Sequence, residues 1–226
     1  MNSAIIVAAG TGTRFGGDIS KQFQILAGKP LFINTLAQFD ACAAVNELIL
    51  VVNANDLEKV ETLCGSNLFR KPLRVVTGGE IRAQSVANGL AAVTSTAEIV
   101  AVHDGARPLI KPSEIELTIE AAREFGAACL VTAVTDTVKE VVDGEITQTI
   151  NRDSLRVALT PQSFRLDLLR RAFAEAEISE STTDECKLVE ALGVRIRAIE
   201  GSKTNIKITH QQDLLIAEAL INAGYV

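Results

Sequence analysis

Short apolar segments typical of buried strands alternate with amphipathic segments typical of helices along nearly the whole chain. The predicted strands cover residues 4–8, 47–53, 73–77, 99–103, 128–134, 195–200 and 205–208, and the predicted helices cover 30–39, 56–63, 81–93, 112–125 and a last segment between Thr209 and Gly224. This alternation predicts an α/β fold of the Rossmann-like kind, in which a mostly parallel sheet is flanked by helices.

The first predicted strand leads directly into a glycine-rich segment, A-A-G-T-G-T-R-F-G-G at positions 8–17, with Lys21 a few residues later. Glycine lets backbone N–H groups approach an anion closely, and Lys21 and Arg14 add full positive charge. The segment predicts a polyphosphate-binding loop, although a plain chain reversal also fits the glycines. Two commoner phosphate loops are disfavoured, because Asp18 stands where a P-loop needs lysine and Phe15 stands where the dinucleotide fingerprint needs glycine.

The composition indicates a cytoplasmic protein that folds as a single domain. Its 226 residues suffice to bury a full core. The 4 cysteines are scattered without a C-x-x-C pair, so we expect reduced thiols. The 2 histidines are too few for a zinc site. The net charge of −6 argues against a nucleic-acid partner. The N-terminal apolar run is too short for a signal sequence or a membrane span, so we expect no membrane partner either.

The segment from 135 to 151 interrupts the alternation. T-V-K-E-V-V, then Asp143-Gly144, then E-I-T-Q-T-I read as two strands joined by a tight turn, which predicts a protruding β-hairpin arm. A lone hairpin is marginally stable in water. We therefore expect the arm to pack on a second subunit in a homodimer; the alternative is that it lies on its own domain.

Ligands of mostly parallel sheets bind beyond the carboxyl ends of the strands, which directs attention to Asp104. This residue follows the strand predicted at 99–103, and a carboxylate there can hold a Mg²⁺ ion that bridges phosphate oxygens. The alternative is that Asp104 caps its turn and pairs with Arg107. We expect His103 to be a buried residue rather than a catalyst.

Three further residues are ambiguous when each is considered alone. Lys207 lies on the alternating segment predicted at 205–208, where a lysine usually marks the solvated face of a strand. Thr183 lies at a predicted helix N-terminus, whose N–H groups could bind a ligand or be satisfied by acidic neighbours. Arg152 follows the predicted arm and carries no signal by itself.

Taken together, the short motifs of this chain resemble the 2-C-methyl-D-erythritol 4-phosphate cytidylyltransferases of the non-mevalonate isoprenoid pathway. The resemblance spans essentially the whole chain. It implies a nucleotidyltransferase-type fold, with the hairpin as a dimer arm that reaches into the partner's site. The motifs are, in chain order, A-A-G-T-G-T-R-F-G followed by K-Q, G-G-x-x-R-x-x-S from Gly78 to Ser85, H-D-G-A-R-P, D-T-V-K, N-R-D, A-L-T-P-Q, T-D-E and N-I-K-I-T.

The resemblance also implies a reaction and a set of site residues. The reaction is transfer of CMP from CTP to the phosphate of methylerythritol phosphate, with Mg²⁺ present and pyrophosphate released. The implied catalytic residues are Arg14 and Lys21 at the triphosphate and Arg152 and Lys207 at the acceptor phosphate. The implied nucleotide-binding residues are Ala8, Ala9, Gly10, Gly12, Gly79, Ser85 and Gly105, and the implied acceptor-binding residues are Asp104, Arg107, Thr137 and Thr183, with Asp104 also at the metal and Thr137 and Arg152 acting across the dimer interface.

Some positions depart from the family pattern, and two alternatives to this function stay open. Glu80-Ile81 replaces the more usual polar pair of the G-G-x-x-R motif, and Thr204 stands where a carboxylate could have assisted the metal. The T-D-E segment and the first glycines are also similar to those of ribitol 5-phosphate cytidylyltransferases. A cytidylyltransferase for another polyol phosphate is therefore one alternative, and a nucleotide-binding regulatory module without catalytic activity is the other.

Overall fold

The computed structural model describes residues 1–10, 15, 20–65 and 68–225. At its centre lies a seven-stranded sheet of order β11-β7-β10-β6-β1-β4-β5, in which every neighbouring pair is parallel except the two pairs made by β10. The predicted α/β fold with a mostly parallel sheet is thus confirmed. The strands are β1 (Asn2–Ala8), β4 (Glu47–Val52), β5 (Leu73–Thr77), β6 (Ile99–Asp104), β7 (Ala127–Ala133), β10 (Arg156–Arg165) and β11 (Arg197–Glu200).

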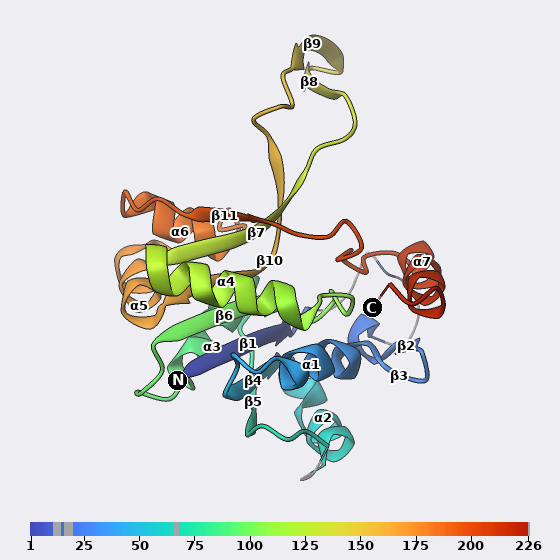
Figure 1. The fold of residues 1–226 in the computed structure, drawn as a ribbon, viewed down its shortest axis with the longest axis vertical. Helices are drawn as coiled ribbons and strands as arrows, with labels where there is room; N and C mark the ends of the chain where they lie inside the picture. Colours follow the sequence, from blue (N-terminus) through green and yellow to red (C-terminus); the bar gives the residue numbers. More distant parts are fainter. Residues whose placement is uncertain (11–14, 16–19, 66–67, 226) are drawn as a thin grey trace.

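Helices cover both faces of this sheet (Figure 1). Alternate residues of β1 point to opposite faces, so Ile6 belongs to the core beneath α1 and α4 while Ile5 belongs to the core beneath α3, α5 and α6. In the described ranges, no helix combines the length and the apolar character needed to cross a membrane. The helices are α1 (Leu31–Ala41), α2 (Leu57–Cys64), α3 (Arg82–Ala91), α4 (Pro112–Phe125), α5 (Leu166–Glu175), α6 (Glu185–Ala191) and α7 (Gln211–Asn222), with single 3₁₀ turns η1 (Lys21–Phe23) and η2 (Ala54–Asp56).

The register of the parallel strands brings their carboxyl ends together. Val7 of β1 pairs with Asp104 of β6, Ala8 of β1 pairs with Val52 of β4, and Val52 pairs in turn with Thr77 of β5. The segments that follow these strands therefore start from one edge of the sheet, where a ligand site is expected.

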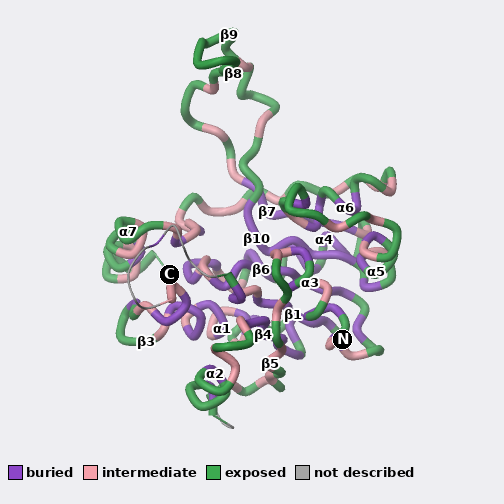
Figure 2. The backbone as a smooth tube through the Cα atoms, turned by 180° about the vertical axis from the view of Figure 1, so that it is seen from behind, coloured by how far each residue is buried: buried purple, intermediate pink, exposed green. Residues whose placement is uncertain are grey.

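A hairpin of β8 (Val138–Val142) and β9 (Glu145–Ile150) projects from the body of the molecule (Figure 1). Asp143 and Gly144 both have positive φ, 51° and 84°, as the tight turn of a two-residue hairpin requires. Nearly all of the arm is exposed, in contrast to the buried central strands (Figure 2). The predicted protruding hairpin is confirmed.

The structure differs from the sequence prediction mainly in the C-terminal third. Residues 205–208, predicted as a strand, form no sheet ladder: the Ile208 N–H donates to the carbonyl of Ala106, and Ile208 packs in a small core with Phe15, Leu26 and α7. The alternation there reflects this one-sided packing. The strand β10 and the helix α5 were not predicted, nor was the short pair β2 (Ile25–Leu26) and β3 (Lys29–Pro30).

Candidate active site

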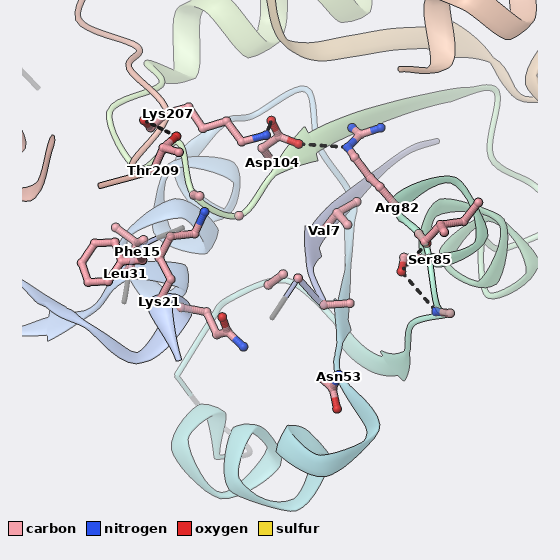
Figure 3. Close-up of a pocket in the computed structure, with 18 of the residues that line it drawn as sticks. Val7, Phe15, Lys21, Leu31, Asn53, Arg82, Ser85, Asp104, Lys207 and Thr209 are labelled. Carbon is pink, nitrogen blue, oxygen red and sulfur yellow. Dashed lines mark hydrogen bonds and ion pairs between the residues drawn. The ribbon is translucent and has the colours of Figure 1, made fainter. Parts of the chain in front are cut away.

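A pocket of about 490 Å³ lies at the carboxyl edge of the sheet, between the ends of β1, β4 and β6 (Figure 3). It gathers residues that are far apart in the sequence. Those that the sequence had already singled out are Ala8, Ala9, Gly10, Lys21, Gly79, Ser85, Asp104, Gly105 and Lys207, and the others include Val7, Gln22, Asn53, Glu80 and Arg82. Gly12 and Arg14 lie outside the described residues.

The glycine segment that follows β5 closes one wall of the pocket. A Cβ atom on Gly78 would lie 2.5 Å from Cβ of Ala9 and 2.7 Å from Oγ of Ser85, so only glycine allows this approach. The Ser85 hydroxyl accepts the Gly79 N–H at 3.1 Å. The first residues of α3 therefore hold this segment against the end of β1. A loop that binds a ligand through its backbone groups has to be fixed in this way.

Lys21 reaches the pocket from a 3₁₀ turn that is tied to the body on both sides. The next residue, Gln22, is buried and donates from Nε2 to Oδ2 of Asp56 at 2.8 Å. Phe23 is buried in the core, and Nζ of Lys59 lies 3.7 Å above the centre of its ring. Figure 3 shows the Lys21 amine pointing into the cavity, toward the side on which Lys207 lies.

Asp104, the last residue of β6, lies on the pocket floor among three cationic side chains. Its Oδ2 lies 2.9 Å from Nζ of Lys207 and 3.5 Å from Nε of Arg107, and its Oδ1 lies 3.2 Å from Nε of Arg82. Burial acts to raise the pKa of Asp104, but Arg82, Lys207 and Arg107 together hold it well below its usual range. Asp104 is therefore a permanent anion that fixes cations at the end of the strand.

The alternative reading of Asp104, a turn residue paired with Arg107, describes its contacts in this structure. Arg107 is largely buried, and its Nη1 donates to the carbonyl of Asn205 at 2.8 Å. Arg107 thus joins the turn after β6 to the segment that carries Lys207. Arg82 was not predicted as a site residue, although its place in the G-G-x-x-R motif was a signal.

His103 is completely buried beside Asp104, as predicted. Its Nε2 lies 3.0 Å from the carbonyl of Arg107, which can only accept, so Nε2 carries the proton and Nδ1 accepts from the Thr160 hydroxyl at 3.0 Å. The Thr160 Oγ1 in turn accepts the Asp104 N–H at 3.1 Å. Burial lowers the pKa of His103 to about 4, so a neutral imidazole braces the backbone at Asp104 and Arg107.

Carboxylates suitable for a metal are few in this part of the protein. Across the described ranges, no group of three or more His, Cys, Asp or Glu side chains is placed to hold an ion. Asp104 is already paired with three cations, so a metal at Asp104 would have to replace at least one of them. Such a donor set fits a Mg²⁺ ion that takes one carboxylate and completes its shell with substrate phosphates and water.

The remaining predicted site residues do not line the pocket of this chain. Thr137 lies at the base of the arm, and Arg152, at its other base, donates to the carbonyl of Thr135. Both side chains are exposed. Thr183 is also exposed, just before α6, whose N-cap Asp184 accepts the Lys187 N–H at 3.1 Å.

Known proteins match this chain over nearly its whole length in sequence and in fold. A family model described as 2-C-methyl-D-erythritol 4-phosphate cytidylyltransferase matches residues 2–223. The enzyme of that name from Bacillus pumilus is 43% identical over 225 residues, which covers 98% of each sequence. A solved structure of 4-diphosphocytidyl-2C-methyl-D-erythritol synthase from Anaerococcus prevotii aligns with a TM-score of 0.84 at 28% identity, covering 98% of this chain and 96% of that one. The 2-C-methyl-D-erythritol 4-phosphate cytidylyltransferase structure from Thermus thermophilus aligns with a TM-score of 0.76 at 31% identity, covering 96% and 98%.

Proposed function

The chain belongs to the 2-C-methyl-D-erythritol 4-phosphate cytidylyltransferase family, and we propose that its pocket transfers CMP from CTP to 2-C-methyl-D-erythritol 4-phosphate in isoprenoid precursor biosynthesis. The observation that carries the proposal is the placing of Lys21, Asp104 and Lys207 in one pocket beside the glycine segments that follow β1 and β5. A nucleotide bound by these backbone segments would present its phosphates to Lys21, with Lys207 on the side of the acceptor phosphate.

The chemistry asks for positioning and charge rather than for a strong base. An oxygen of the acceptor phosphate attacks the α-phosphorus of CTP, and the bond from that phosphorus to the pyrophosphate oxygen breaks. The attacking oxygen is already anionic, so no proton has to be removed, which agrees with a buried and neutral His103. The protein must instead offset the repulsion between two anions, and Arg14 and Lys21 at the triphosphate serve this in our proposal.

Lys207 has a partner to exchange when the acceptor binds. Its amine lies 2.9 Å from Asp104, and its side chain is about a third exposed at 37%. Because Arg82 and Arg107 also contact Asp104, that carboxylate stays paired when Lys207 turns to a phosphate. We therefore assign Lys207 to binding of the acceptor phosphate. Asp104 and Arg107 hold Lys207 in place for that contact.

Magnesium enters the proposal through CTP. The ion would neutralise charge on the triphosphate, held by phosphate oxygens with Asp104 as a carboxylate ligand. The backbone groups of Ala8, Ala9, Gly10, Gly79 and Gly105, with Ser85 behind them, are the proposed nucleotide-binding residues, together with Gly12.

The site is complete, in our proposal, only in a homodimer. Val141, Val142 and Ile146 are 56%, 52% and 65% exposed on the arm, an apolar surface that a second subunit would cover. Such a contact would bring Thr137 and Arg152 to the pocket of the partner. The four free, buried cysteines support a reducing compartment, and we propose a cytoplasmic location.

Pyrophosphate release tests the proposed reaction directly. The protein is mixed with CTP and Mg²⁺ and with either methylerythritol phosphate or ribitol 5-phosphate. We expect turnover with the first acceptor and little with the second. The reverse preference would establish the other polyol phosphate, and CTP binding without turnover on either acceptor would favour the regulatory module.

A further inference from the structure

Arg82 joins the ends of three elements that belong to different parts of the chain. It is the first residue of α3 and contacts Asp104 at the end of β6 through Nε. Its two terminal nitrogens lie 2.6 and 3.1 Å from the two carboxylate oxygens of Glu185, the first residue of α6. A guanidinium that forks onto one carboxylate and also binds another has little freedom to rotate.

The contacts around Arg82 close into a ring. The Glu185 and Cys186 N–H groups both donate to Oε1 of Gln162 at 3.2 Å, so the start of α6 is fixed to β10. Two residues before Gln162, Thr160 accepts the backbone N–H of Asp104. The ring therefore runs from Asp104 through Arg82, Glu185, Gln162 and Thr160 back to Asp104.

This ring lies between the two ends of the proposed site. On one side, Arg82 follows the segment of Gly79 and precedes Ser85, the proposed nucleotide wall. On the other side, Glu185 follows Thr183, an exposed residue that the motif resemblance implies for the acceptor. Figure 3 shows the Arg82 guanidinium meeting Asp104 from the side opposite Lys207. A displacement of Arg82 would thus change the acceptor end and the floor of the pocket together.

We propose that Arg82 and Glu185 are positioning residues for the transfer reaction, which set Asp104 and the segment 182–185 around Thr183 at the correct place relative to the bound nucleotide. The inference rests on the proposed function and adds to it two residues that act through others. Glu185 is completely buried, and Arg82 is 25% exposed toward the pocket. A purely structural contact at this place could be apolar, because buried ion pairs are often replaceable by hydrophobic residues without loss of stability.

The double variant Arg82→Met/Glu185→Leu tests the proposal, because it removes both charges while keeping an apolar contact. We expect a cooperative thermal melt near that of the wild type. We also expect a KM for methylerythritol phosphate raised about tenfold or more and a lower kcat, with the Kd for CTP, measured by calorimetry without acceptor, changed less than about threefold. Arg82→Lys retains the positive charge but not the bidentate contact of a guanidinium. Its KM and kcat should lie between those of the wild type and the double variant.

The matched control is Arg171→Ala/Glu175→Ala, which removes an ion pair of 2.8 Å on the outer face of α5 and should leave both constants unchanged. The proposal is overturned if the double variant has the kinetic constants of the wild type. It is also overturned if the variant loses affinity for CTP to the same extent as for the acceptor. If the double variant does not fold, Glu185→Gln takes its place, because glutamine keeps the shape of the side chain. The same comparison is made, between the KM for methylerythritol phosphate and kcat on one hand and the Kd for CTP on the other. Absence of turnover in the wild type would instead count against the proposed function.

Discussion

Lys21 lies on the side of the pocket that we propose for the triphosphate. Removal of its side chain should therefore weaken binding of the transition state more than binding of CTP. We expect Lys21→Ala to lower kcat about 10²–10³-fold, the loss of about 2.7–4 kcal/mol that follows removal of one preorganised donor, while the Kd for CTP changes far less. Steady-state kinetics and calorimetry measure the two quantities. Lys29→Ala, an exposed lysine of β3, is the control, and an unchanged kcat in Lys21→Ala would contradict the assignment.

His103 should make the protein less stable in mild acid. Its pKa is about 4 in the folded protein against 6.5 in the unfolded chain, so between these values only the unfolded state binds the proton. Stability is then lost as the pH falls from 7 toward 4, by about 2 kcal/mol at pH 5 from this residue alone. Urea denaturation at pH 7 and pH 5 should show this loss in the wild type.

The variant His103→Gln isolates that contribution, because glutamine can still donate to the Arg107 carbonyl but does not titrate. Its stability should differ between the two pH values by about 2 kcal/mol less than the wild type's. The other histidine, His210, is present in both proteins and cancels. An identical pH dependence in the two proteins would contradict the buried neutral imidazole.

At the scale of elements, the approach of the β5–α3 segment to the end of β1 depends on the absence of a side chain at position 78. Gly78→Ala would place a Cβ 2.5 Å from that of Ala9, and we expect a cost of about 1–3 kcal/mol in the free energy of unfolding together with weaker CTP binding. Ala9→Gly in the same chain should recover part of the stability, though not the contact with Ser85. Chemical denaturation and calorimetry are the measurements.

Gly10→Ala provides the comparison, because an added Cβ there meets no atom of the described residues within 4 Å and should leave the unfolding midpoint unchanged. Equal destabilisation by Gly78→Ala and Gly10→Ala would mean that backbone freedom, rather than close approach, explains both glycines.

The apolar parallel strands could be predicted from the sequence, whereas β10 could not. Strands buried on both faces, such as β1 and β6, read as continuous apolar runs. The middle of β10 instead reads T-P-Q-S, with a proline that normally argues against a central strand. Its buried polar groups are satisfied by distant partners, for example Ser163 by Thr118 of α4, and such pairings are not visible in one sequence.

The same reasoning separates the predictable part of the site from the rest. The glycine segments and Asp104 could be located because they follow recognisable strands. Lys207 entered the site although its predicted strand was wrong, because the motif resemblance did not depend on that strand. Arg82 and Glu185 are 103 positions apart, and only the fold, which brings the N-termini of α3 and α6 together, makes them partners.

For the whole molecule, the proposed dimer arm leads to a prediction that mixing two inactive proteins restores activity. Each proposed site takes Lys21 from one subunit and Arg152 from the arm of the other. In a mixed dimer of Lys21→Ala and Arg152→Ala chains, one site carries both defects and the other carries neither. After random exchange of subunits, half of the dimers are mixed and half of their sites are intact, so we expect about a quarter of the wild-type activity.

The pair Lys21→Ala and Lys207→Ala is the matched control, because both residues lie in the body of the same subunit. Every site of a mixed dimer then retains one defect, and mixing should restore nothing. The two mixtures are compared by pyrophosphate release after co-refolding, with light scattering to establish the dimer. If the arm instead served its own subunit, or if the chain were a monomer, the Lys21→Ala and Arg152→Ala mixture would stay as inactive as the control. This comparison therefore separates an arm that completes the neighbouring site from one that folds back on its own subunit.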